Sequence, residues 1–215
     1  MVILRRMGLA VAVGIVPDEE TDAEERAERR AEADALAVEL AMEGVRWREP
    51  ERGRVPATRA HVGSFSYSCL HTLRRVYALL DEGRPVTPAA ADTAEDDAEV
   101  VESVSLMFES HLLNHSDCEG YYVPAEFDDP LFLPPDRVAG GGMVGSCQAL
   151  LAELRICAPA IGIRLGPDGA LSDAEADRVY ELPEDDPFST ETMVWLTLHE
   201  QCIASIASGR ALVFC

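Results

Sequence analysis

The sequence predicts an α+β fold in which about five helices pack on a small mixed sheet. Several segments repeat apolar residues at three- and four-residue spacing and end near a glycine, which is typical of amphipathic helices. Short apolar or aromatic runs, such as 121–123 and 211–215, are typical of strands. No segment repeats with a fixed period, so we expect one α+β domain over residues 1–215, in which 1–6 is an extension if the chain starts at Met7.

The N-terminal half is expected to contain one strand and two helices. Its first apolar residues favour a buried strand over a secretion signal, because no small-residue cleavage site precedes the acidic run after Val16. Thr21 and Glu24 form a capping box for the first helix, and Gly44 can end it. In chain order we expect a strand within 1–16, a helix at 23–43, a connecting loop at 45–63, a helix at 68–82 and a flexible acidic loop at 86–98.

The C-terminal half is expected to alternate helices with short strands. A helix at 100–115 would carry His111 and His115 on its apolar stripe. Ser172 and Glu175 form a second capping box. The remaining expected elements are a strand at 121–123, a proline-rich loop at 124–136, a helix at 147–158, a strand and turn within 160–172, helices at 173–182 and 191–208, and a strand at 211–215.

The composition restricts the partners and the compartment. Acidic residues outnumber basic ones by 39 to 18, which gives a formal net charge of −21. This charge repels phosphate backbones and anionic lipids, so we expect neither nucleic acid nor a membrane as a partner, but a basic protein or a small ligand. Six cysteines at irregular spacing indicate reduced thiols, and no apolar run reaches the ~20 residues needed to span a bilayer. We therefore expect a cytoplasmic protein.

The densest group of reactive side chains lies between residues 111 and 122. His111 and His115, four residues apart on the expected helix, and Asp117 on the following turn could together bind zinc. Glu119 would then act as the general base of a metal-assisted hydrolase, although the glutamate of the H-E-x-x-H protease motif is missing. The alternative is that both histidines are half-buried and bonded to backbone or acidic neighbours.

A calcium loop can be aligned with the same residues. Counted from His115, the loop places Asp117 third, Glu119 fifth, Gly120 sixth and Glu126 twelfth. A histidine at the leading position lacks the negative charge that calcium prefers there. Calcium is thus the second metal that the sequence suggests.

Two further sets of residues could carry chemistry. Cys118 could act as a nucleophile if His71 or His199 approached it from a distant segment. Arg74 and Arg75 could contact an anionic ligand, although pairing with surface carboxylates is the more common arrangement.

The string HLLNHSDCEGYYVP, together with GGGMVGS and the closing ALVFC, resembles a family of bacterial proteins of unassigned function built around an H-S-D-C-E-G-Y-Y-V-P core. The resemblance covers nearly the whole chain from Met7. It implies a single domain, and it directs attention to the same cluster and to Tyr121 as a ligand contact.

The sequence therefore leaves three functions open. The first is a cytoplasmic interaction protein, which the acidic charge and the lack of a complete catalytic signature favour. The second is the metal-assisted hydrolase described above. The third is a structural role for the motif, as a buried polar turn that joins a helix to a sheet.

Overall fold

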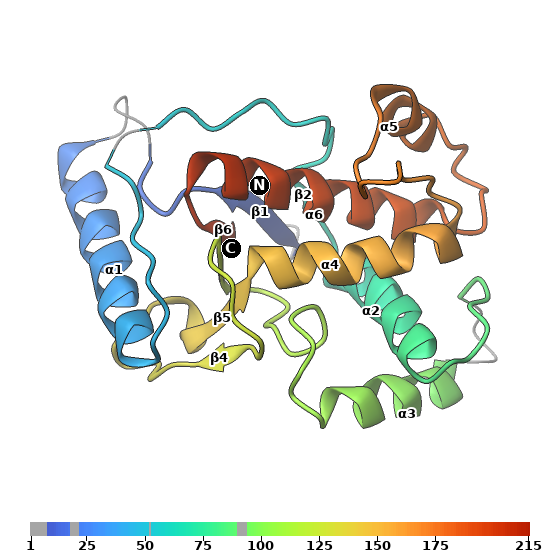
Figure 1. The fold of residues 1–215 in the computed structure, drawn as a ribbon, viewed down its shortest axis with the longest axis horizontal. Helices are drawn as coiled ribbons and strands as arrows, with labels where there is room; N and C mark the ends of the chain where they lie inside the picture. The colour runs from blue at the N-terminus through green and yellow to red at the C-terminus, as the bar shows by residue number, and fades with distance from the viewer. Residues whose placement is uncertain (1–7, 18–21, 52, 90–93) are drawn as a thin grey trace, which may run out of the picture.

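A computed structural model describes residues 8–17, 22–51, 53–89 and 94–215. Within these residues the chain forms six α-helices and six short strands, so the predicted α+β class is confirmed (Figure 1). The expected extension 1–6 and the Thr21 half of the first capping box lie outside the described residues.

The strands form one mixed sheet with the order β2-β1-β6-β3-β5-β4. Only the pair β3 and β5 is parallel among the paired strands of the described chain. The strands are β1 (Leu9–Val13), β2 (Ser64–Phe65), β3 (Gly120–Val123), β4 (Leu131–Phe132), β5 (Met143–Ser146) and β6 (Leu212–Phe214).

Most helices begin and end where the local sequence predicts. Ser146 and Ser172 cap their helices by accepting hydrogen bonds from the amides of Ala149 and Glu175, and Gly209 ends the last helix in the left-handed conformation. The helices are α1 (Ala23–Met42), α2 (Tyr67–Asp81), α3 (Ala94–Ser105), α4 (Cys147–Cys157), α5 (Asp173–Tyr180) and α6 (Ser189–Ser208).

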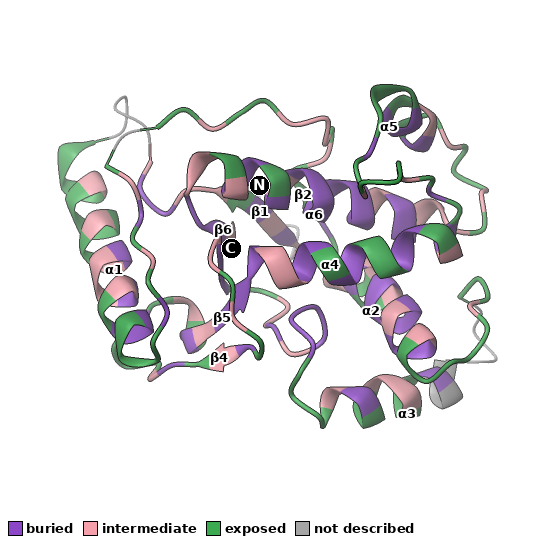
Figure 2. Cartoon of the chain, viewed as in Figure 1, coloured by how far each residue is buried: buried purple, intermediate pink, exposed green. Residues whose placement is uncertain are grey.

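The sheet separates two apolar clusters. On one face it packs against α2, α4 and α6, and α6 is buried along most of its length (Figure 2). On the other face it packs against α1, which lies apart from the other helices (Figure 1). Successive residues of β3 point to opposite faces, so Tyr122 joins the first cluster while Tyr121 and Val123 join the second.

One helix is much shorter than predicted. The expected helix at 100–115 ends at Ser105, and Phe108 has a positive φ of 57°, a conformation that no right-handed helix contains. The carbonyl of Ser105 accepts hydrogen bonds from the Phe108 amide (3.2 Å) and from the Asn114 side chain (2.7 Å). His111 and His115 therefore lie on an irregular turn and do not share a helix face, so the prediction of a common helical stripe is wrong.

Two smaller predictions are also wrong. The acidic loop expected at 86–98 gives way to α3 at Ala94. The strand expected within 160–172 is replaced by a 3-10 turn over Ala158–Ile161, because Pro159 at its start suits a helical turn and Gly162 ends it with a φ of 77°. In the described part of the chain, no helix has the length and apolar character needed to cross a membrane.

Candidate functional site

The predicted site residues lie on the turn between α3 and β3, residues 110–119, which we call the histidine turn. A buried carboxylate from α4 supports it. Glu153 accepts the backbone N–H groups of His111 (2.8 Å) and Leu112 (2.7 Å), one with each oxygen. Burial raises the pKa of Glu153 to about 7, against the lowering effect of these amides. If α3 continued, these two N–H groups would bond to backbone carbonyls of the helix. In the turn, the carboxylate of Glu153 takes the place of those carbonyls.

His111 is bonded at both ring nitrogens. The amide of Ser146 donates to Nδ1 (3.0 Å), so Nδ1 carries no proton, and Nε2 donates to the carbonyl of Asp128 (3.1 Å). Burial lowers the pKa of the His111 ring, which keeps this neutral tautomer. His111 therefore joins the end of β5 to the loop after β3.

His115 is buried between the turn and the sheet. Its ring stacks on Tyr122, with centroids 4.1 Å apart, and its nitrogens lie 3.1 and 3.2 Å from the carbonyl oxygens of Ser116 and Tyr121. Burial lowers the pKa of His115 to about 4, so the ring is neutral at pH 7. The ring also requires glycine at position 120, because a Cβ there would lie 2.9 Å from the His115 Cε1 atom.

Asp117 pairs with two side chains of α2 and with neither histidine of the turn. It pairs with Arg74 and, through Oδ2, with the Nε2 atom of His71 at 2.7 Å. Burial alone would raise the pKa of Asp117, but these two partners lower it overall. Arg74 also donates to the carbonyls of Leu112 (2.8 Å) and His115 (2.6 Å), so one buried guanidinium holds the turn against α2.

The remaining predicted residues are dispersed. Arg75 is buried, pairs with Asp97 and donates to the carbonyl of Thr87. Tyr121 faces α1, and burial raises its pKa to about 12. Cys118 and Glu119 are exposed, and the Cys118 sulfur lies 3.6 Å from the Ser116 hydroxyl. Of its two expected histidine partners, His71 is paired with Asp117, and His199 is buried on α6 beside Glu200.

This arrangement is that of a buried polar turn. The three residues predicted to bind metal, His111, His115 and Asp117, have separate partners, and across the described chain no group of three or more His, Cys, Asp or Glu side chains is arranged to hold a metal ion. Residues 120–123 of the expected calcium loop form β3, whose backbone pairs with β5 and β6. The geometry therefore offers no support for the metal-assisted hydrolase.

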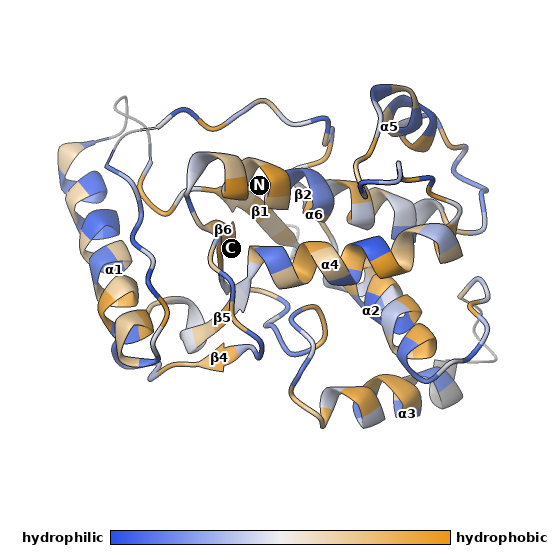
Figure 3. Cartoon of the chain, in the orientation of Figure 1, coloured by the Kyte–Doolittle hydropathy of each residue, from blue (hydrophilic) through white to orange (hydrophobic). Residues whose placement is uncertain are grey.

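A different surface directs its charge toward solvent. Asp177, Glu181, Glu184 and Asp185, on α5 and the loop that follows, are exposed, and we call them the acidic face. This loop is coloured as hydrophilic in Figure 3. Among the residues that the structure describes, no arginine forms a salt bridge with any of the four.

The nearby arginines are already occupied. Arg164 and Arg178 both pair with Glu175, and Arg59 pairs with Asp173 and Glu200. The acidic face therefore keeps its negative charge toward solvent.

The signal for the acidic face in the sequence is one of composition and not of a motif. Residues 177–186 are rich in aspartate and glutamate, but composition alone does not show which carboxylates are paired. Val179 turns its side of α5 toward the core, so Asp177 and Glu181 on the opposite side face solvent.

The fold and the surface define an acidic α+β protein without an assembled metal or nucleophile cluster among the described residues. Residues 7–214 match the family described as "Putative DNA-mimic protein", and the chain belongs to this family. The expected membership, over nearly the full length, of a family of unassigned function is thereby confirmed. A search of curated proteins and a search of solved structures found no match.

The family corrects the partners expected from the sequence. That expectation named a basic protein or a small ligand and set nucleic acid aside, because a net charge of −21 repels phosphate. A family described by its likeness to DNA connects the same charge to nucleic-acid recognition. Repulsion between like charges excludes direct contact with DNA, but it does not exclude imitation of DNA.

Proposed function

We propose that this protein is a cytoplasmic DNA mimic, which occupies the DNA-contacting surface of a DNA-binding protein and so competes with DNA. The observation that carries the proposal is the acidic face, where four exposed carboxylates have no arginine partner in the described structure. Family membership and the net charge of −21 support it.

The physical basis is the sign and position of the charge. DNA attracts its proteins mainly through phosphates, which lysine and arginine side chains neutralise with release of counterions. Carboxylates held on a rigid surface present the same sign of charge to the same side chains. Arg59 links the start of α5, which carries part of the acidic face, to α6 through Asp173 (3.0 Å) and Glu200 (2.7 Å).

The test is competition with DNA. The immobilised protein is exposed to a lysate of its source cells, and proteins released by duplex DNA are identified and purified. Adding the protein to such a partner should displace a fluorescent duplex, and the affinity should fall steeply with salt, as it does for DNA. Failure to displace the duplex at low salt from any partner that it binds would contradict the proposal.

A charge-matched pair of variants locates the surface. In one variant the four carboxylates of the acidic face are replaced by the corresponding amides. In the control variant four exposed carboxylates elsewhere, Glu28, Glu43, Glu109 and Glu126, become glutamines. We expect the first variant to lose displacement and the control to keep most of it, whereas equal losses would show that only net charge matters.

A further inference from the structure

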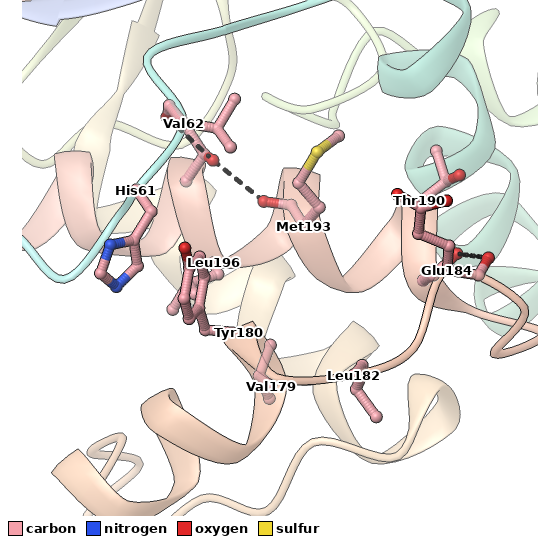
Figure 4. Close-up of a pocket in the computed structure, with 11 residues that line it drawn as sticks. His61, Val62, Val179, Tyr180, Leu182, Glu184, Thr190, Met193 and Leu196 are labelled. Atoms are coloured by element: carbon pink, nitrogen blue, oxygen red, sulfur yellow. Dashed lines mark hydrogen bonds between the residues drawn. The ribbon is translucent and has the colours of Figure 1, made fainter.

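A cavity of about 420 Å³ opens beside the acidic face, between α5 and α6 (Figure 4). Val179, Met193 and Leu196 give it an apolar lining, and Glu184 of the acidic face lies on its edge. Its volume falls within the range of about 300–1,000 Å³ that is typical of ligand sites. The cavity can therefore accept an apolar group from a molecule that the acidic face attracts.

Two neighbouring rings form one wall of the cavity. The centroids of His61 and Tyr180 lie 3.8 Å apart, with the ring planes tilted by 31°. Both side chains are exposed, and Tyr180 retains 56% of its accessible surface. Their separation is close to the rise of about 3.4 Å between successive bases along a DNA strand. An incoming side chain would thus meet a pair of aromatic rings beside negative charge.

The wall is held in place before any partner binds. The backbone amide and side chain of Arg59 donate to Glu200 on α6, at 2.9 and 2.7 Å, and its guanidinium also reaches the carbonyl of Leu171 before α5. The hydroxyl of Thr197 on α6 lies 3.4 Å from the carbonyl of Val62. Because these contacts fix the segment that carries His61, little ordering is needed on binding.

We infer that this cavity receives an apolar side chain from the DNA-contacting surface of the partner, an inference that rests on the proposed DNA mimicry. Proteins that bend DNA insert leucine, methionine, isoleucine, phenylalanine or proline between base steps, next to arginine and lysine that contact the flanking phosphates. The cavity would take the place of the opened base step, with the His61 and Tyr180 rings as one of its walls, and the acidic face that of the phosphates. The occupant is therefore a basic segment with one apolar wedge.

A pair of peptides tests this directly. One is a short peptide rich in lysine and arginine with a single central leucine, and the other has alanine in its place. We expect the leucine peptide to bind about tenfold more tightly at low salt, as burial of one such side chain predicts. In nuclear magnetic resonance spectra, the leucine peptide should shift the methyl resonance of Met193, and the alanine peptide should not.

Two variants and a control distinguish the contribution of the cavity to peptide binding from that of the charge. Thr190→Trp fills the cavity at the start of α6, and Tyr180→Ala removes an exposed ring of its wall. Each should remove the preference for leucine and leave binding of the alanine peptide unchanged. Ile156→Ala, which truncates a side chain that is 53% exposed on α4, should change neither.

The outcomes distinguish the proposed role of the cavity from the proposed DNA mimicry. Equal binding of both peptides to the unaltered protein would overturn the role of the cavity and leave the DNA mimicry standing. No binding of either peptide at low salt would contradict both. Concentration-dependent self-association that the leucine peptide disrupts would assign the cavity to a second copy of this chain and overturn the inference.

Discussion

The histidine turn and the acidic face both contain several ionisable side chains, but they differ in where the partners of those side chains lie. On the histidine turn, His111, His115 and Asp117 are bonded to atoms of the same chain. On the acidic face, the carboxylates are exposed and have no arginine partner among the described residues. The comparison teaches that reactive residue types close together in sequence can serve the fold, while the function we propose rests on groups whose partners must come from another molecule.

We expect the largest loss of stability from Arg74→Met, which tests whether the side chains of the histidine turn serve the fold. The substitution leaves Asp117 and two carbonyl oxygens of the histidine turn without their buried donor, so the free energy of unfolding should fall by about 3–5 kcal/mol in urea titrations. Arg29→Met, which removes an exposed pair with Glu32, is the control and should cost less than about 1 kcal/mol. Similar costs for both variants would mean that the turn is not held by Arg74.

The second-largest effect is a pH dependence of the free energy of unfolding, and it originates at His115. Its pKa is lowered to about 4 in the folded chain from an ordinary value near 6.5, so the unfolded chain binds the proton first as the pH falls. The stability that the neutral ring contributes is complete above about pH 6.5 and is lost as the pH falls toward 4, by about 3 kcal/mol. His115→Phe keeps the stack on Tyr122 but has no proton to bind. When the free energy of unfolding is measured against pH, this variant should therefore lose less stability between about pH 6.5 and pH 4 than the unaltered protein.

The third effect concerns the carboxylate beneath the histidine turn. In Glu153→Gln, one of the two backbone amides that now meet carboxylate oxygens would face an NH₂ group instead. We expect a loss of about 1–3 kcal/mol in the free energy of unfolding, measured by urea titration. The preceding residue on α4, Ala152, is exposed, so Ala152→Gln places the same side chain on the surface and serves as the control with little expected change.

The smallest effect on stability is expected at the acidic face. Replacing its four carboxylates by amides should change the free energy of unfolding by no more than about 0.5 kcal/mol per substitution, because exposed groups without partners contribute little to the fold. The same variant should bind a basic partner with a shallower salt dependence. A large loss of stability here would break the comparison, since it would show that these carboxylates also serve the fold.

Much of the fold could be predicted because its signals are local. The helix expected at 191–208 is observed at Ser189–Ser208, and the serine predicted to begin α5 caps it. The prediction of a helix over 100–115 was wrong because the helical spacing of apolar residues continues in the sequence beyond Phe108, where the chain turns. The acceptor that stabilises the turn, Glu153, comes from a distant helix.

The candidate site was harder to predict for the same reason. The His71 and Asp117 side chains are 46 residues apart in sequence, and no spacing rule connects them. The charge on the protein is evident from composition, but composition alone does not distinguish repulsion of DNA from the imitation of DNA that we propose, because both begin from the same negative sign.

The sequence by itself determined the α+β class, most helix ends and the net charge, because these depend on periodicity, capping residues and composition along the chain. Only the tertiary structure decided which ionisable groups are buried with partners and which face solvent. Burial and pairing bring together residues as distant as Arg59 and Glu200, 141 positions apart, and the energy of a charge depends on those neighbours and not on its place in the sequence.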